Sequence, residues 1–253
     1  MNISFISAVL PVVLLLIFIY RKDKYQPEPI GKLLLTFFVG CFSVIPAGIQ
    51  ETFLMLFAPS DEVLPVLNGL YDGYVVAGFS EELWKLILLM LVIWRSPHFD
   101  EYFDGIVYAA YLSLGFACVE NIGYVMSGED QMGTALMRGL LAVPAHFLFA
   151  VIMGYHLSLA KFDPSSRGRH LFHALLYPAL MHGTYDALLM ISSNLGADGE
   201  TFNIACGVLT VVFIVFDIKM WHWGLKRIKR LQERSKEQGF DRQHPFDGFQ
   251  WEF

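Results

Sequence analysis

The sequence predicts an all-α fold, a polytopic transmembrane helix bundle of about seven spans. Hydrophobic residues make up 55% of the 253 residues and the mean hydropathy is +0.48, which is more apolar than a soluble domain of this size. The apolar residues are grouped in runs of about 20, the length at which a helix crosses a bilayer. The lysines and arginines fall almost entirely in alternate loops, as they do in multi-pass proteins.

The first two apolar runs cover residues 4–20 and 33–57. The first run has no preceding basic residues and no small-residue cleavage site. We therefore expect it to be a retained span and not a removed signal peptide. The second run is longer than a bilayer requires, so its end, between Gln50 and Pro59, could tilt strongly or lie along the interface.

The next four runs each contain ionisable side chains away from their ends; they cover residues 73–94, 104–126, 134–158 and 170–192. The seventh run covers residues 201–222. The chain after Trp221 mixes tryptophan, leucine and isoleucine with lysine and arginine, as an interfacial helix attracted to anionic lipid does. We therefore expect a transmembrane domain over residues 1–222 and a cytoplasmic basic amphipathic tail over residues 223–253.

Orientation follows from the positions of the basic residues. Every lysine and arginine except Lys85, inside a run, and Arg138 lies on one side of this topology. Because basic residues gather on the cytoplasmic side, we expect the N-terminus outside and the C-terminus in the cytoplasm. That requires an odd number of spans and favours seven over six or eight. With a net charge of −6, the chain is expected to contact membrane lipids and not nucleic acid.

Ionisable residues inside the predicted spans need an explanation, because each charge near the bilayer centre costs about 2.5 to 3.5 kcal/mol. In chain order these residues are Glu81, Glu82, Lys85, Glu120, His146, His182 and Asp186. Such residues usually face a protein interior or a water-filled cavity and serve a function.

Their spacing and depth predict a single site. Lys85 follows Glu81 and Glu82 by four and three residues, and Asp186 follows His182 by four, so both sets share a helical face. Lys85 can neutralise a carboxylate, and Asp186 can orient the His182 ring. At a rise of 1.5 Å per residue, the polar groups lie roughly 9 to 18 Å below the outer boundary. We expect these helices to form one cavity open to the outside.

These residue types suit hydrolysis by activated water. Ser80 and Cys118 have no neighbouring histidine in the sequence that would activate them as nucleophiles. We expect Glu81 or Glu82 to act as the general base, and His182 and His146 to bind the water or the oxyanion.

Glu120 and Asp186 are expected to support this site. A zinc ion is the alternative way to activate the water, and its candidate ligands are Glu82, Glu120, His146 and His182.

At these residues the chain resembles the PrsW family of intramembrane proteases, which is related to CAAX prenyl endopeptidases and bacteriocin-processing membrane enzymes. The family pattern of EExxK, FxxxE and HxxxD is present in order, as Glu81 to Lys85, Phe116 to Glu120, and His182 to Asp186. The stretch RKDKYQPEP from Arg21 and the stretch DGIVYAA from Asp104 also resemble this family. The resemblance covers most of the chain.

The resemblance implies a multi-pass protease of the bacterial cytoplasmic membrane, with Glu81, Glu82 and His182 as catalytic residues. It also implies cleavage of a single-span membrane protein, such as an anti-sigma factor, on its extracytoplasmic side. It leaves the cofactor open, because PrsW proteins are often called metalloproteases whereas the CAAX enzymes use a glutamate-activated water.

Two alternatives remain at this point. Intramembrane Glu, Lys and His groups also form proton relays, so a proton- or ion-coupled transporter is the second hypothesis. A transporter needs access from both faces, and no interrupted repeats mark a midplane site. A non-catalytic scaffold, in which the glutamates only hold helices together, is the third.

Overall fold

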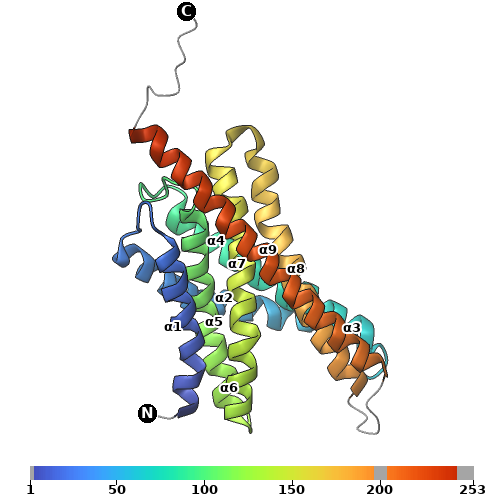
Figure 1. Ribbon diagram of the computed structural model, residues 1–253. Coiled ribbons are helices and arrows are strands. Elements are labelled where there is room, and N and C mark those ends of the chain that lie inside the picture. Colours follow the sequence, from blue (N-terminus) through green and yellow to red (C-terminus); the bar gives the residue numbers. More distant parts are fainter. Residues whose placement is uncertain (1–2, 197–203, 244–253) are drawn as a thin grey trace, which may run out of the picture.

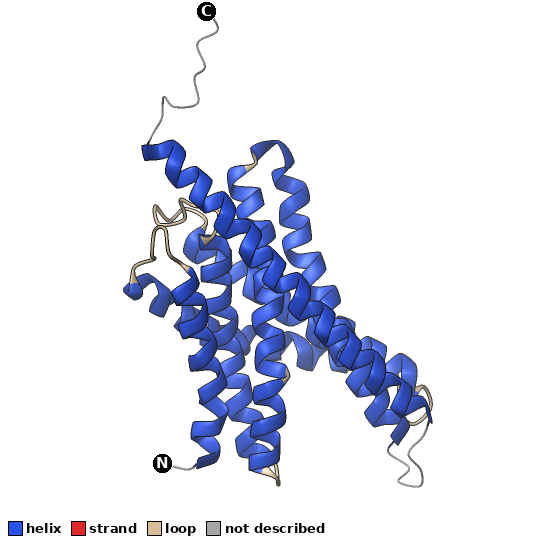
Figure 2. Cartoon of the chain, viewed as in Figure 1, coloured by secondary structure: helices blue, strands red, loops and turns tan. Residues whose placement is uncertain are grey.

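The computed structural model describes residues 3–196 and 204–243, and 87% of these described residues are helical. No strand occurs in the described part of the chain, which forms a bundle of helices joined by short loops (Figure 2). The predicted all-α fold class is therefore confirmed.

Most helices follow the apolar runs of the sequence (Figure 1). In chain order the elements are α1 (Ile3–Lys22), α2 (Ile30–Met55), α3 (Pro65–Tyr71), the π-helix η1 (Asp72–Phe79), α4 (Ser80–Ile93), α5 (Asp104–Ser127), α6 (Gln131–Leu140), α7 (Ala142–Phe162), the short 3-10 helix η2 (Pro164–Ser166), α8 (Arg167–Gly196) and α9 (Ile204–Gln243).

Within the described residues, 5 helical stretches are long and apolar enough to cross a membrane. They are α1, α2, α5, the α6–α7 pair and α9 as far as Gly239. This supports a multi-pass membrane protein. The third and sixth predicted spans are helical too, but the third is divided between η1 and α4, and α8 contains several histidines and other polar side chains. The count of seven and the orientation of the termini therefore stay predictions.

Two of the predicted segments differ in detail from the structure. The run 134–158 is interrupted at Leu141, between α6 and α7. Pro144 explains the break, because proline has no N–H to donate to the carbonyl of Leu140, four residues earlier. The predicted domain boundary at residue 222 lies inside α9, which continues without interruption from the last apolar run into the basic segment.

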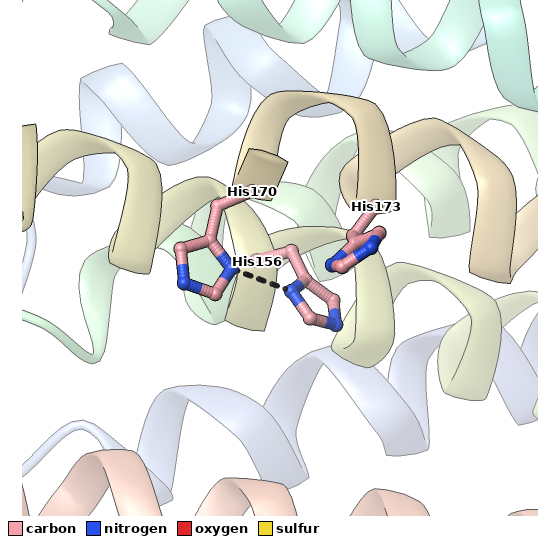
Figure 3. Close-up of side chains that lie close together, drawn as sticks. All are labelled: His156, His170 and His173. Carbon is pink, nitrogen blue, oxygen red and sulfur yellow. Dashed lines mark hydrogen bonds between the residues drawn. The ribbon is translucent and has the colours of Figure 1, made fainter. Parts of the chain in front are cut away.

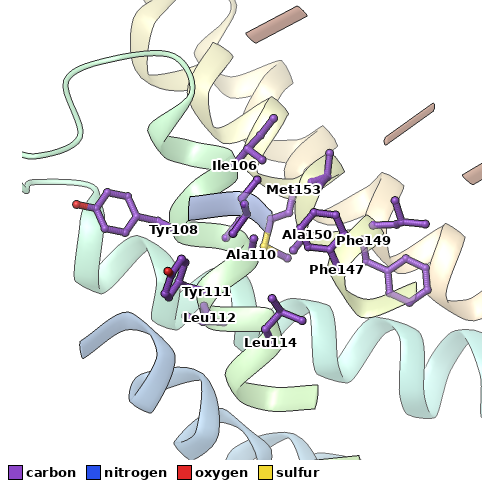
Figure 4. Packing of buried hydrophobic residues seen from close by; sticks show 14 of the residues in the cluster. Ile106, Tyr108, Ala110, Tyr111, Leu112, Leu114, Phe147, Phe149, Ala150 and Met153 are labelled. Atoms are coloured by element: carbon purple, nitrogen blue, oxygen red, sulfur yellow. The ribbon is translucent and has the colours of Figure 1, made fainter. Parts of the chain in front are cut away.

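The centre of the bundle is formed by α5 and α7. Every residue of α5 from Asp104 to Cys118 and every residue of α7 from Val143 to Ala160 is buried, as expected for helices surrounded by other helices. The two helices touch backbone to backbone, since a Cβ on Gly105 would lie 2.7 Å from the carbonyl oxygen of Gly154. Large side chains of both helices, such as Leu114 and Phe147, belong to the same buried core (Figure 4).

A second close contact joins η1 to α8. A Cβ on Gly78 would lie 2.7 Å from the backbone nitrogen of Gly183, so only small residues allow the two helices to approach this closely. The hydroxyl groups of Tyr74 and Thr184 also form a hydrogen bond of 2.7 Å. This contact brings the start of α4, which directly follows η1, alongside the middle of α8.

The loops predicted to be cytoplasmic gather at one end of the bundle. Lys32 donates a hydrogen bond to the carbonyl oxygen of Val92, and Lys161 donates one to that of Trp94. The oblique helix α9 crosses α7 and α8 (Figure 1), and Gln232 on it donates to the carbonyl oxygen of Lys22. We call this end, which includes the turn between α7 and α8, the basic end.

Candidate active site

The ionisable residues predicted to share one site come from four helices and lie together. α4 carries Glu81, Glu82 and Lys85, α5 carries Glu120, α7 carries His146, and α8 carries His182 and Asp186. One ligand-type atom from each of Glu81, Glu82, His146 and His182 lies within 4.8 Å of the others, and all four side chains are buried. The helix contacts described above bring these residues together, although Glu81 and His182 are 101 positions apart in the sequence.

Lys85 is at the centre of this group and is fully buried. Its Nζ lies 2.9 Å from Glu81 Oε2, 2.8 Å from Glu82 Oε1 and 3.2 Å from His146 Nδ1. An ammonium group has three hydrogens to donate, so all of them are used. The Nζ also lies 4.0 Å from the centroid of the Phe116 ring, whose face attracts a cation. Lys85 thus forms ion pairs with both glutamates.

His182 is held between two carboxylates. Its Nδ1 lies 3.0 Å from Glu82 Oε1, and its Nε2 lies 3.1 Å from Asp186 Oδ2. Because a carboxylate only accepts, both ring nitrogens are satisfied when the ring is a doubly protonated imidazolium. The Phe149 ring stacks on His182 at 4.7 Å and fixes the plane of the imidazole.

His146 has a different pair of neighbours. Its Nδ1 accepts the hydrogen bond from Lys85, so its Nε2 carries the proton and donates to Glu120 Oε2 at 2.9 Å. The same Glu120 oxygen lies 2.8 Å from Arg138 Nη2, and the Arg138 Nε donates to Asn121 Oδ1 at 3.1 Å. The neutral ring of His146 therefore connects the ammonium of Lys85 to a second ion pair.

A cavity of about 430 Å³ lies against this cluster, a size typical of small ligand sites. Its ionisable lining residues include Glu51, Asp72, Glu81, Glu120, Arg138, His146, His182 and Asp186. Glu82 and Lys85 do not line it and lie behind this wall, fully buried. Of the two adjacent glutamates, only Glu81 thus faces the space in which a substrate and a water could meet.

Comparison with known proteins agrees with this geometry. The family model of the "PrsW family intramembrane metalloprotease" matches residues 28–218, which include every residue of the site described above. The chain belongs to the PrsW family. It is therefore a protease, and this selects the peptidase hypothesis over the transporter and the scaffold.

Bacterial relatives named "Protease PrsW" match along most of their length. The protein from Clostridioides difficile is 31% identical over 237 residues, which cover 92% of this chain and 93% of the relative. The protein from Bacillus subtilis is 34% identical over 225 residues, which cover 88% and 93%. No solved structure matches the chain. The PrsW relatives and the membrane helices together indicate a multi-pass bacterial membrane protein.

The family description names a metal, so the fit of a metal to these residues can be tested. Two glutamates and two histidines within 4.8 Å are ligand types that zinc accepts. However, the Lys85 ammonium lies within 3.2 Å of ligand atoms of Glu81, Glu82 and His146. A cation at this position must displace the ammonium, and the same atoms cannot hold both. As arranged here, the residues do not fit a metal ion.

Three charged residues of the cavity wall were not predicted as site residues from the sequence. Arg138 entered the sequence argument only as the single basic residue on the outer side, Glu51 only within the stretch from Gln50 to Pro59 that could lie along the interface, and Asp72 not at all; all three line the cavity. The signal for Arg138 in the sequence was its position, because it is the single basic residue on the outer side, where basic residues are disfavoured. Glu51 offered no comparable signal.

Proposed function

We propose that the protein cleaves a single-span, membrane-anchored protein with a water molecule activated by Glu81, on the outer side of the bacterial cytoplasmic membrane. The observation that carries this proposal is the unequal placement of the glutamate pair. Glu81 lines the cavity, whereas Glu82 is fully buried against Lys85 and His182. Glu82 and Lys85 then hold the site together, and Glu81 meets the reacting groups.

In the proposed reaction, Glu81 carries the proton from the water to the leaving amine. Glu81 takes a proton from water as the oxygen attacks the peptide carbonyl carbon. The carbonyl oxygen becomes an oxyanion, which Arg138 is positioned to stabilise from the cavity wall, and the positive charge of the nearby His182 ring adds to this stabilisation. Protonated Glu81 then returns the proton to the leaving amine as the C–N bond breaks. Glu120 and Asp186 orient His146 and His182 through the hydrogen bonds described above.

The proposed orientation has the N-terminus outside and the C-terminus in the cytoplasm, in a seven-span topology in which η1 with α4, and α8, also cross the membrane. It is supported by the contacts among the basic loops at one end of the bundle. It is also supported by Arg138, the one basic residue on the outer side, because its guanidinium group is paired with Glu120 in the cavity. A cavity open to the outer side suits a substrate of the anti-sigma-factor type, which is cut outside the cell before its signal is released.

The test is cleavage of a single-span reporter of the anti-sigma-factor type by purified protein in proteoliposomes. Glu81→Gln is expected to lower the rate by about 10² to 10⁴, because amide nitrogen cannot act as a general base. Glu51→Gln removes a carboxylate from the same cavity without touching the proposed base, so it serves as the matched control and should keep most of the activity.

Two further variants test the residues that hold the site together or contribute charge to it. Glu82→Gln and His182→Ala should also abolish cleavage while the protein stays folded, as judged by its thermal transition. Near wild-type cleavage by Glu81→Gln would reject the assignment of the base. Cleavage that occurs only when the reporter segment faces the C-terminal side of the protein would reject the proposed orientation.

A further inference from the structure

A second polar pocket lies at the basic end, away from the catalytic cavity. It has a volume of about 460 Å³ and is formed where α7, α8 and α9 meet. α7 contributes His156, α8 contributes His170 and His173, and α9 contributes Arg227, Arg230 and Arg234. Figure 3 shows the three imidazole rings turned toward one another from two helices. Nothing in the proposed proteolytic reaction uses these residues.

The histidines form a compact group with unused hydrogen-bonding capacity. His156 Nδ1 and His170 Nδ1 are 3.1 Å apart, and the rings of His156 and His173 have centroids 5.3 Å apart. His156 is buried, with only 7% of its surface exposed. Its Nε2 is also buried and has no hydrogen-bond partner among the described residues. A buried polar atom in this state is destabilising unless a ligand or water satisfies it.

The arginines add positive charge that is not balanced within the described part of the protein. None of Arg227, Arg230 and Arg234 forms an ion pair there, and the buried Nε of Arg227 has no partner. The guanidinium groups of Arg227 and Arg230 instead lie over the Tyr155 ring, at 5.4 and 5.9 Å from its centroid. The aromatic ring holds both guanidinium groups in place beside the pocket.

One carboxylate lines the pocket, that of Asp163, and it is already engaged. Ser165 donates to Asp163 Oδ1 at 2.6 Å, and Ser166 donates to Oδ2. The lining therefore combines three guanidinium groups and three imidazoles with a single acid whose two oxygens already accept hydrogen bonds. Charge and donor count together favour an anionic ligand with several acceptor oxygens.

We propose that this pocket binds a phosphate group, supplied by the headgroup of an anionic phospholipid or by free phosphate. Arginine forks match the geometry of phosphate oxygens, and basic pockets between membrane helices on the cytoplasmic side bind anionic headgroups. The pocket lies on α9 next to Trp223 and the start of the basic segment, where a helix leaving the membrane meets headgroups. A phosphate there links three helices, two of which carry His146 and His182.

A divalent metal is the competing ligand, because the three histidines can bring ligand atoms within 4.8 Å of one another. The arginines weigh against it, since three guanidinium groups in the same pocket repel a dication. The pocket therefore favours the anion, and zinc binding becomes one outcome of the test.

The experiment compares two double variants that remove the same charge from α9. Arg230→Gln/Arg234→Gln removes two pocket arginines, and Lys226→Gln/Lys229→Gln removes two lysines on exposed positions of the helix outside the pocket. The full-length protein is titrated with inorganic phosphate, and separately with zinc, in a neutral detergent. It is also placed in nanodiscs of phosphatidylcholine alone, or of equal parts phosphatidylcholine and phosphatidylglycerol. The readouts are binding affinity and Tm.

We expect wild type to bind with saturation in at least one arm and the ligand to raise Tm. The pocket variant should bind about tenfold more weakly or worse, whereas the lysine variant should change by less than about twofold in the phosphate arm. Response to inorganic phosphate identifies free phosphate as a sufficient ligand, and response only to phosphatidylglycerol identifies the lipid headgroup. His170→Ala, which leaves the arginines in place, should also weaken binding.

The proposal is overturned by equal losses in the two double variants, which would indicate only nonspecific attraction to charge, or by no saturable binding in either arm. Stoichiometric zinc binding that is lost in His170→Ala but kept in the arginine variant would identify a metal site instead. Neither result depends on protease activity, so the test is independent of the proposed catalytic mechanism.

Discussion

Two buried groups of carboxylates lie at opposite ends of α5, and they are stabilised in different ways. At the catalytic site, Glu81, Glu82 and Glu120 are paired with Lys85 or Arg138. At the basic end, Asp104 accepts hydrogen bonds from the backbone N–H groups of Asp100 and Glu101, at 2.9 and 2.7 Å. Nearby, Glu28 accepts a hydrogen bond from the Tyr108 hydroxyl, and Asp23 accepts one from the Glu28 N–H.

The two groups differ in what offsets the cost of burying a carboxylate. At the catalytic site, cations pair with the carboxylates. Neutral donors compensate burial less well. In the loop between α1 and α2, burial raises the pKa of Glu28 to about 7 and that of Asp23 to about 6, even though hydrogen bonds to both act in the opposite direction. The predictions below test this contrast.

The largest effect is expected from Lys85→Met. This change leaves Glu81 and Glu82 buried without their shared cation, and breaking a buried ion pair costs about 3 to 5 kcal/mol. We expect a large fall in Tm together with loss of cleavage. Lys85→Met/Glu82→Gln, which removes a negative charge along with the positive one, should recover part of the stability but none of the activity. Unchanged stability in the single variant would show that the catalytic cluster is not balanced by Lys85.

Arg138→Gln should have a smaller effect on stability and a clear one on activity. The Arg138 and Glu120 side chains are each about one-fifth exposed, so the loss of their ion pair is expected to cost about 1 kcal/mol. If Arg138 stabilises the oxyanion, kcat should fall by about tenfold or more with little change in KM. Arg138→Lys keeps the charge and should retain part of the rate. A change confined to KM would indicate a role in substrate binding only.

The group at the basic end predicts a pH dependence of stability. The folded pKa of Glu28 lies above its ordinary value of 4.5, so the folded state binds the proton more tightly than the unfolded state. Its contribution is therefore fully present below about pH 4.5 and is lost as the pH rises through about 7. We expect Glu28 to account for about 1 to 2 kcal/mol of that loss.

Glu28→Gln mimics the protonated side chain and should flatten the decline in Tm between acid and neutral pH. Tm would be followed by tryptophan fluorescence in a neutral detergent. A variant with the same pH profile as wild type would contradict the assignment to Glu28.

The smallest effect is expected from metal removal. Because Lys85 already occupies the ligand atoms of Glu81, Glu82 and His146, dialysis against a strong chelator should leave cleavage within about twofold of the untreated rate. Metal analysis of the active protein accompanies the assay. Loss of activity that returns only with zinc would show that the ammonium gives way to a metal in the working enzyme.

The sequence predicted those features of the site that depend on helical period. The contacts of Lys85 with Glu81 and Glu82 and of His182 with Asp186 follow from spacings of three and four residues. The gathering of four helices could be inferred because a charge in a membrane needs surroundings other than lipid. The contacts between helices could not be predicted from the sequence. The carboxylate oxygen that meets His182 or Arg138 depends on how closely η1 and α8 approach and on the break at Leu141.

The histidine and arginine pocket was missed for a similar reason. His156, His170 and His173 fell near predicted span ends, where single histidines are unremarkable, and their meeting depends on the turn between α7 and α8. The three arginines that face them lie on a segment expected to form a separate tail. Because α9 continues through residue 222, the helix face that carries these arginines lies against α7 and α8.

The π-helix η1 makes the order of the two glutamates depend on register. Neighbouring residues of an α-helix point about 100° apart, so Glu81 reaches the cavity and Glu82 the interior only for one rotation of α4. The wider turn of η1, directly upstream, sets that rotation against a partner helix that glycine contacts hold in place. Removing one residue within Asp72–Phe79 would turn α4 by one position and place Glu82 where Glu81 now faces the cavity, without altering a single catalytic side chain.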